Sequence, residues 1–321
     1  MAGLHHSVIS AFGASKVIRE KGYYKTIDGT KMIRKTKDDR GQIMARYQLL
    51  DHCNKTGYLW LERYHLSKDE LPYVYYDGEY YIMTSLFKHK EADFTVDSEF
   101  FKVVKALASF HKAARSVTFS DGAFLHKKSL ITPLTEVIQT SSINLDAIRK
   151  RIRKQSKMSD FDVLFVKHFS DYRNRVFRAL QLLESTGYLK HLTKARQHYH
   201  VCHGALKEDC LKIWDDHVYI TNLENTKISY QLDDLCDLIR RRERKTPINV
   251  ATVIDAYSDV LPLKPEEEVI LEAMLLYPAA FVKISTEYYR KKRSWTPISM
   301  INKMQEVVNN TSSTTSAEPF T

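Results

Sequence analysis

Two Asp-Gly pairs constrain the N-terminal part of this 321-residue chain most strongly. Asp28-Gly29 lies between residues 23–27 and 30–34, and Asp77-Gly78 lies between residues 74–76 and 79–83. The flanking runs are aromatic and β-branched, and an Asp-Gly pair favours the positive φ angles of a tight hairpin turn. The sequence therefore predicts two β-hairpins within the first 85 residues.

Helical patterns surround these hairpins. A short helix is expected in the first ~20 residues, with Leu4, Val8, Phe12 and Val17 on its apolar side, and another over residues 42–54. From about residue 95 apolar residues recur at helical spacing, first over 101–111 and then over 161–183, where the run ends near Gly187. Short strands are predicted at 210–214 and 218–222, and further helices at 232–242, 250–260, 266–276 and 279–290.

These patterns predict an α+β protein with three parts. A β-rich N-lobe would span residues 1–88 and a mainly helical C-lobe residues 89–308. Residues 309–321 are polar and low in complexity, so we expect a disordered tail there.

The chain is basic, with a formal net charge of +10 and a pI of about 9.2. Lys and Arg concentrate in runs at 149–154, 240–245 and 290–293. Such runs can bind nucleic acid, but no nucleic-acid-binding motif accompanies them, so solvated helix faces are the favoured interpretation. The four cysteines form no C-x-x-C pair, which favours reduced, mostly buried thiols.

Hydrophobic runs look short and are interrupted by charges. No uninterrupted run approaches the roughly 18 apolar residues of a spanning helix, so no membrane span is predicted. The N-terminus lacks a basic segment followed by a long apolar one, so no signal peptide is expected.

The segment around residues 202–223 carries the pattern of a phosphotransferase site. It reads Cys-His-Gly-Ala-Leu-Lys-Glu-Asp-Cys over 202–210 and Tyr-Ile-Thr-Asn-Leu over 219–223. His203-Gly204 resembles the His-Gly-Asp motif of aminoglycoside phosphotransferases and choline kinases. That resemblance places Ala205 at the catalytic Asp, Cys210 at the metal-binding Asn and Asn222 at the second metal-binding Asp.

Phosphoryl transfer needs a carboxylate that receives the hydroxyl proton and ligands that hold magnesium. Alanine does neither. The resemblance also places Arg34 where an N-lobe Lys contacts nucleotide phosphates. Lys35 is adjacent, but on a strand its side chain should point to the opposite face. The helix over 42–54 offers no Glu to pair with such a lysine, and no glycine-rich phosphate loop is present, so we expect neither nucleotide nor other cofactor binding.

Over about residues 20–300 the chain also resembles the CotS-type spore-coat family of this superfamily. The segments that carry this resemblance are 80–84, 106–113, His203-Gly204, Asp234-Leu235, Tyr277-Pro278 and 288–295. The resemblance implies a two-lobed kinase-like fold and a place in the coat of a bacterial endospore. Synthesis would occur in the mother-cell cytoplasm, and other spore-coat proteins would be the partners.

We therefore expect a noncatalytic, pseudokinase-like coat protein, with His203, Gly204 and Asp234 in structural roles. One alternative is an active small-molecule phosphotransferase with an altered metal site at Asp209 or Glu224. A single carboxylate holds magnesium weakly, which disfavours this alternative. A second alternative is a nucleic-acid-associated protein that uses the basic runs.

Overall fold

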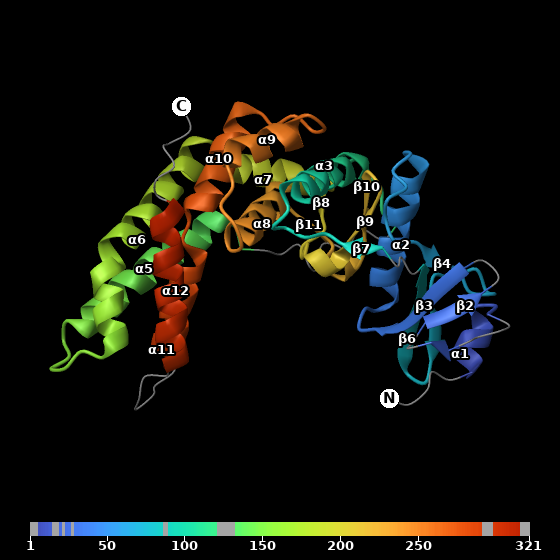
Figure 1. Cartoon of the computed structure of the whole chain (residues 1–321), viewed down its shortest axis with the longest axis horizontal. Helices are drawn as coiled ribbons and strands as arrows, with labels where there is room; N and C mark the ends of the chain where they lie inside the picture. Colours follow the sequence, from blue (N-terminus) through green and yellow to red (C-terminus); the bar gives the residue numbers. More distant parts are fainter. Residues whose placement is uncertain are drawn as a thin grey trace. The chain divides into compact units, whose positions relative to one another are not determined.

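The computed structural model describes residues 6–14, 19–20, 23–26, 29–85, 89–120, 132–290 and 298–314 (Figure 1). The chain divides into two compact units. Unit 1 comprises Met1–Ile131, Lys194–Leu238 and Asp255–Pro262, and unit 2 comprises Thr132–Thr193, Ile239–Ile254 and Leu263–Thr321. These boundaries differ from the lobe boundary at residue 88, which stays a prediction.

Unit 1 contains a six-stranded antiparallel sheet in the order β1-β2-β3-β6-β4, with β5 also paired to β6. Both predicted hairpin strand pairs are confirmed, β2 with β3 and β5 with β6. Asp77 and Gly78 have φ angles of 49° and 78°, as a tight hairpin turn requires; Ile27 and Asp28 lie outside the described residues. The strands are β1 (Arg19–Glu20), β2 (Tyr23–Thr26), β3 (Gly29–Thr36), β4 (Tyr64–His65), β5 (Val74–Tyr76) and β6 (Glu79–Ser85).

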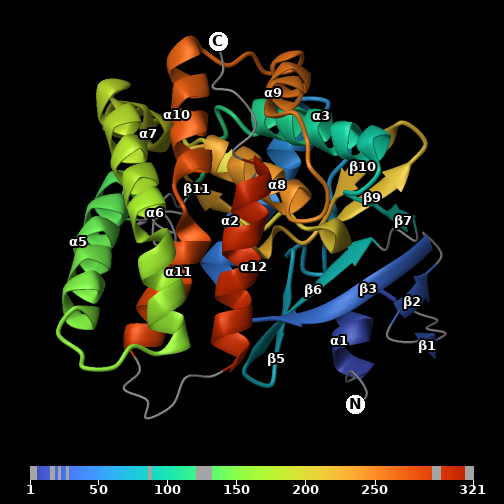
Figure 2. The same ribbon diagram turned by 60° about the vertical axis from the view of Figure 1, so that its left-hand side comes forward.

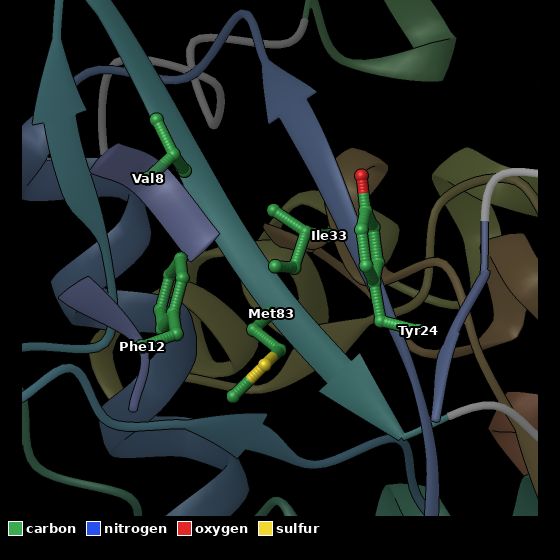
Figure 3. Close-up of a cluster of buried hydrophobic side chains, with 5 residues drawn as sticks. All are labelled: Val8, Phe12, Tyr24, Ile33 and Met83. Atoms are coloured by element: carbon green, nitrogen blue, oxygen red, sulfur yellow. The ribbon is translucent and has the colours of Figure 1, made fainter. Parts of the chain in front are cut away.

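Helix α1 (His6–Ala11) and the turn after it pack on one face of this sheet. Val8 and Phe12 contact the buried side chains of Tyr24, Ile33 and Met83 (Figure 3). Because side chains alternate along a strand, Ile33 on this face directs its neighbour Arg34 to the opposite face. Leu4 and Val17, which were also predicted for this helix, lie outside the described residues.

Unit 1 also holds two helices and two small sheets. Helix α2 (Arg40–Lys55) begins with a capping box between Asp39 and Gln42, and α3 (Asp97–Ala113) buries the predicted apolar residues Val104, Leu107 and Ala108. The small sheets contain β7 (Lys90–Glu91), β9 (Leu211–Trp214) and β10 (His217–Ile220) in one, and β8 (Val201–Cys202) and β11 (Lys227–Ile228) in the other.

Unit 2 is helical (Figure 2). Helices α5, α7 and α12 were missing from the sequence prediction. Two residues on the buried side of α5, Thr135 and Ser141, are polar, so the apolar periodicity of this helix is weak along the sequence. The helices that lie wholly in this unit are α5 (Leu134–Ile152), α6 (Asp160–Ser185), α10 (Pro265–Leu276), α11 (Ala279–Arg290) and α12 (Ile298–Thr314). The helices with residues in both units are α7 (Tyr188–Gln197), α8 (Leu232–Glu243) and α9 (Val250–Ser258).

Two expectations about the C-terminal part need correction. Helix α12 buries Met304 and Val308 and continues to Thr314, beyond the predicted helical limit at residue 308, while residues 315–321 lie outside the described part. Among the described residues, the segment Pro265–Arg290 is long and apolar enough to span a membrane, with a mean hydropathy of 1.5 over 18 residues. Glu272 and Lys283 interrupt its apolar residues, so no unbroken apolar run of this length is present along the sequence. Nevertheless 44% of that window is buried within the protein, and Arg240 donates a hydrogen bond of 2.7 Å to the carbonyl of Tyr277 where α10 ends.

Candidate functional site

The His203-Gly204 segment follows strand β8 and is held by the carboxylate of Asp234. Asp234 accepts hydrogen bonds from the backbone amides of His203 (2.6 Å) and Gly204 (2.9 Å), and its Oδ2 lies 3.1 Å from Nε2 of His111. Burial alone would raise the pKa of Asp234, but the hydrogen bonds from His111 and the Gly204 amide lower it. Asp234, in the first turn of α8, thus joins α3 and α8 to the loop as a buried anion.

His111 has one defined tautomer. Burial lowers its pKa, so the ring is neutral near pH 7. A carboxylate only accepts hydrogen bonds, so Nε2 carries the proton that is donated to Asp234. Nδ1 then accepts from the hydroxyl of Tyr257 at 2.8 Å.

Both ring nitrogens of His203 are used within the protein. Nε2 donates to the carbonyl oxygen of Thr221 at 3.0 Å, and Nδ1 accepts from the Ala205 amide at 3.4 Å. The fully buried ring therefore fixes the distance between this loop and the segment after β10.

Gly204 is required by its conformation and by its surroundings. Its φ angle is +80°, and a Cβ placed on it would lie 2.2 Å from the carbonyl oxygen of Asn225. A methyl group cannot occupy that space unless one of the two main-chain segments moves.

The structure brings the three altered motif positions together. The thiol of Cys210 lies 3.9 Å from the carbonyl oxygen of Ala205 and 3.8 Å from Nδ2 of Asn222. Burial, together with the neighbouring carboxylate of Asp209, raises the pKa of Cys210 to about 11, so the sulfur is a neutral thiol near pH 7. Asn222 adopts a left-handed conformation (φ 60°, ψ 58°), and its Oδ1 is buried without a hydrogen-bond partner. This cluster offers a methyl group, a thiol and an amide.

Arg34 on strand β3 forms ion pairs with two carboxylates. It pairs with Glu224, in the short 3-10 turn η2 (Leu223–Asn225), and its Nη2 lies 3.6 Å from Oε2 of Glu62. Glu62 also accepts a hydrogen bond of 3.0 Å from the backbone amide of Leu223. Lys35 points the other way, as predicted, and pairs with Glu79 at 2.7 Å.

A second buried arginine extends this network. Arg46 of α2 donates to Asp38 at 2.7 Å, to the Tyr64 hydroxyl at 3.3 Å and to the Glu224 carbonyl at 3.3 Å. Burial alone would lower the pKa of Arg46, but Tyr64 and Asp38 raise it, so the guanidinium stays charged.

Asp38, Arg46 and Glu62 were absent from the sequence prediction. Arg46 left a signal, because it stands three residues after Ile43 and four before Leu50 on the apolar side of α2. A charged residue at that spacing indicates a buried ion pair. Glu62 left no such signal.

Magnesium and a nucleoside triphosphate, which the resemblance to phosphotransferases implies, do not fit the residues of this site. Among the described residues no group of three or more His, Cys, Asp or Glu side chains could hold a metal ion. Asp209 accepts from the Cys210 thiol at 3.2 Å, and Glu224 is paired with Arg34. Glu62 is the second carboxylate beside Glu224, but Arg34 pairs with both, and in the described part of the chain no third ligand joins them.

The fold is that of aminoglycoside phosphotransferases, a kinase-like fold, which confirms the predicted fold class. An aminoglycoside phosphotransferase from Alicyclobacillus acidocaldarius is similar at a TM-score of 0.81 and 16% identity, over 97% of this chain and 93% of that one. AMP-bound spectinomycin phosphotransferase APH(9)-Ia is similar at a TM-score of 0.58 and 12% identity, over 91% and 90% of the two chains. At these identities the likeness concerns the fold alone.

The chain belongs to the family described as "Spore coat putative kinase YutH", whose model matches residues 10–317. The predicted resemblance to spore-coat proteins of this superfamily is thereby confirmed. The comparison with curated proteins found no match.

Proposed function

We propose that this chain is a noncatalytic, pseudokinase-like protein of the spore coat that acts through contacts with other coat proteins. It is made in the mother-cell cytoplasm and then joins the coat. The observation that carries the proposal is the convergence of Ala205, Cys210 and Asn222 at the positions where this fold needs a proton acceptor and metal ligands.

The chemistry of these side chains supports the loss of catalysis. A methyl group cannot accept the proton of an attacking hydroxyl, and a neutral thiol and an amide do not neutralise a transferred phosphoryl group. Magnesium prefers several carboxylate oxygens, and the side chains of Ala205, Cys210 and Asn222 provide none. The one carboxylate beside them, Asp209, accepts a hydrogen bond from the Cys210 thiol.

The ion pairs of Arg34 support the same conclusion. The cation expected to meet nucleotide phosphates is already paired with Glu224 and Glu62. A phosphate would have to displace a carboxylate from Arg34, so part of its binding energy would be lost.

A thermal-unfolding screen with ATP tests the proposal, with and without magnesium. A ligand at 100 times its dissociation constant stabilises a protein by about 2.7 kcal/mol, which is readily measured. We expect no magnesium-dependent shift and no transfer of γ-phosphate to any acceptor. The combined variant Ala205→Asp, Cys210→Asn, Asn222→Asp is the matched comparison, because it restores the missing groups, and we expect it to gain a magnesium-dependent shift.

One result would contradict the noncatalytic proposal, and another would contradict the assignment to the coat. Turnover of γ-phosphate by the unaltered chain, abolished by Glu224→Gln or Asp209→Asn, would establish the altered metal site and end the noncatalytic proposal. A fluorescent fusion that stays dispersed in the mother cell throughout sporulation would contradict the coat assignment.

A further inference from the structure

Helices α5 and α6 of unit 2 pack side by side as an antiparallel pair (Figure 2). Both helices carry exposed apolar side chains. On α6 Val163, Val166 and Phe177 are 52%, 40% and 56% exposed, and on α5 Ile143 is 69% exposed. Most large apolar residues of a helix pair are buried, so a group with this exposure indicates an interaction surface.

The Asp146–Arg173 ion pair aligns the two helices. Arg173 donates from Nε to Oδ1 of Asp146 at 2.9 Å and from Nη2 to Oδ2 at 3.3 Å. Ile143 stands three residues before Asp146, and Phe177 stands four after Arg173, so both lie on the side of the helices that carries this pair. Val166 precedes Arg173 by two helical turns. We name the surface formed by Ile143, Asp146, Val163, Val166, Arg173 and Phe177 the α5–α6 face.

The charge of the protein is concentrated in the unit that carries this face. Unit 2 has 23 Lys and Arg against 14 Asp and Glu, whereas unit 1 has 26 against 25. Lys150 and Lys167 are exposed beside the α5–α6 face, and Arg153, Lys154 and Lys157 are exposed in the connection between the helices. Residues 134–185 carry ten Lys and Arg against six Asp and Glu, among them the exposed Glu136, Asp160 and Asp171, so the apolar stripe lies in a moderately positive surround.

We propose that the α5–α6 face binds an acidic amphipathic helix of another coat protein, which deepens the proposed function and rests on it. The fifteen residues from Val163 to Phe177 span about 21 Å, the length of a four-turn helix. Exposed Ile, Val and Phe provide anchors for apolar residues of the partner at i, i+3, i+4 and i+7, while its Asp and Glu meet the basic surround.

The same features disfavour other occupants. A second copy of this chain would bring two positive surfaces together. Nucleic acid would neutralise the charge but leave the four apolar side chains without a partner. An acidic helix satisfies both parts of the surface.

Site-specific photo-crosslinking in the full chain tests the proposal. A photo-crosslinking phenylalanine analogue replaces Phe177 during sporulation, with the same analogue at Leu189 of α7 as the control, because Leu189 is 52% exposed away from the face. We expect an adduct only from position 177, mapped to an acidic amphipathic segment. A synthetic peptide of that segment should bind the purified chain.

Binding of that peptide should weaken at least about tenfold in Phe177→Glu and in the double variant Lys150→Glu, Lys167→Glu, but not in Leu189→Glu. The unfolding midpoint of Phe177→Glu should match that of the unaltered chain, since the side chain is exposed. No adduct, an adduct only with this chain or with nucleic acid, a captured segment without acidic residues, or unchanged peptide affinity in Phe177→Glu would each overturn the proposal. Phosphoryl transfer by the unaltered chain would end the noncatalytic proposal without changing the binding of the peptide to the α5–α6 face.

Discussion

Replacing Gly204 with alanine measures the effect of the close contact between this position and the carbonyl oxygen of Asn225. Gly204 and Gly78 have nearly equal φ angles, +80° and +78°, but a Cβ at Gly204 would meet the Asn225 carbonyl at 2.2 Å, whereas nothing lies within 4 Å of one at Gly78. Left-handed backbone costs an alanine about 1–2 kcal/mol at either position. Overpacking adds about 1–3 kcal/mol at Gly204 alone.

We therefore expect Gly78→Ala to lower the free energy of unfolding by about 1–2 kcal/mol and Gly204→Ala by about 2–5 kcal/mol. Urea unfolding followed by circular dichroism measures both changes under the same conditions. Equal losses of unfolding free energy in the two variants would refute the reasoning, because the contact with Asn225 would then contribute nothing to the cost. Gly204→Ser should behave like Gly204→Ala, since the clash comes from Cβ.

Three other predictions concern buried polar groups. Asp234→Ala leaves three hydrogen-bond donors without their acceptor and should lower the free energy of unfolding by about 3–5 kcal/mol. The control is Asp259→Ala, because Asp259 is exposed. Equal urea midpoints for the two variants would contradict the role of Asp234. Burial and the charge of Arg115 lower the pKa of His200 to about 4, below its unfolded value near 6.5, so its stabilisation is complete above pH 6.5 and is lost as pH falls toward 4. The ring is partly exposed, so solvent screens the effect, and the loss of stability from pH 7 to 5 should be about 1 kcal/mol. This loss should be absent in His200→Gln, and an identical pH profile for that variant would refute the prediction. Asp38→Ala leaves the buried charge of Arg46 without its partner and should lower the free energy of unfolding by about 3–5 kcal/mol. The double variant with Arg46→Met should recover most of this loss. Additive losses in a double-mutant cycle would contradict a stabilising ion pair.

Features set by local chemistry were predictable from the sequence. The β5–β6 hairpin follows from the turn at Asp77-Gly78, and α6 follows from a long apolar period. The convergence of Ala205, Cys210 and Asn222 was predictable only because a known motif relates positions that are distant along the chain.

Features that depend on contacts between distant segments were not predictable. Arg34 meets Glu62 and Glu224 only after β3, the segment before β4 and the η2 turn have come together. Helix α5 shows why weak periodicity fails: the sequence displays the charge run at 149–154, in which the helix ends, but no clear apolar period before it. Tertiary packing selects such a helix where local pattern does not.

Asp234 binds the main chain of the loop rather than a side chain at position 205. The hydrogen bonds that hold the loop therefore do not depend on the side chain at position 205. A change of that side chain can leave the main chain of the loop in place, so a partner that recognises its shape would not detect the change. In this architecture, recognition and chemistry can be gained or lost independently.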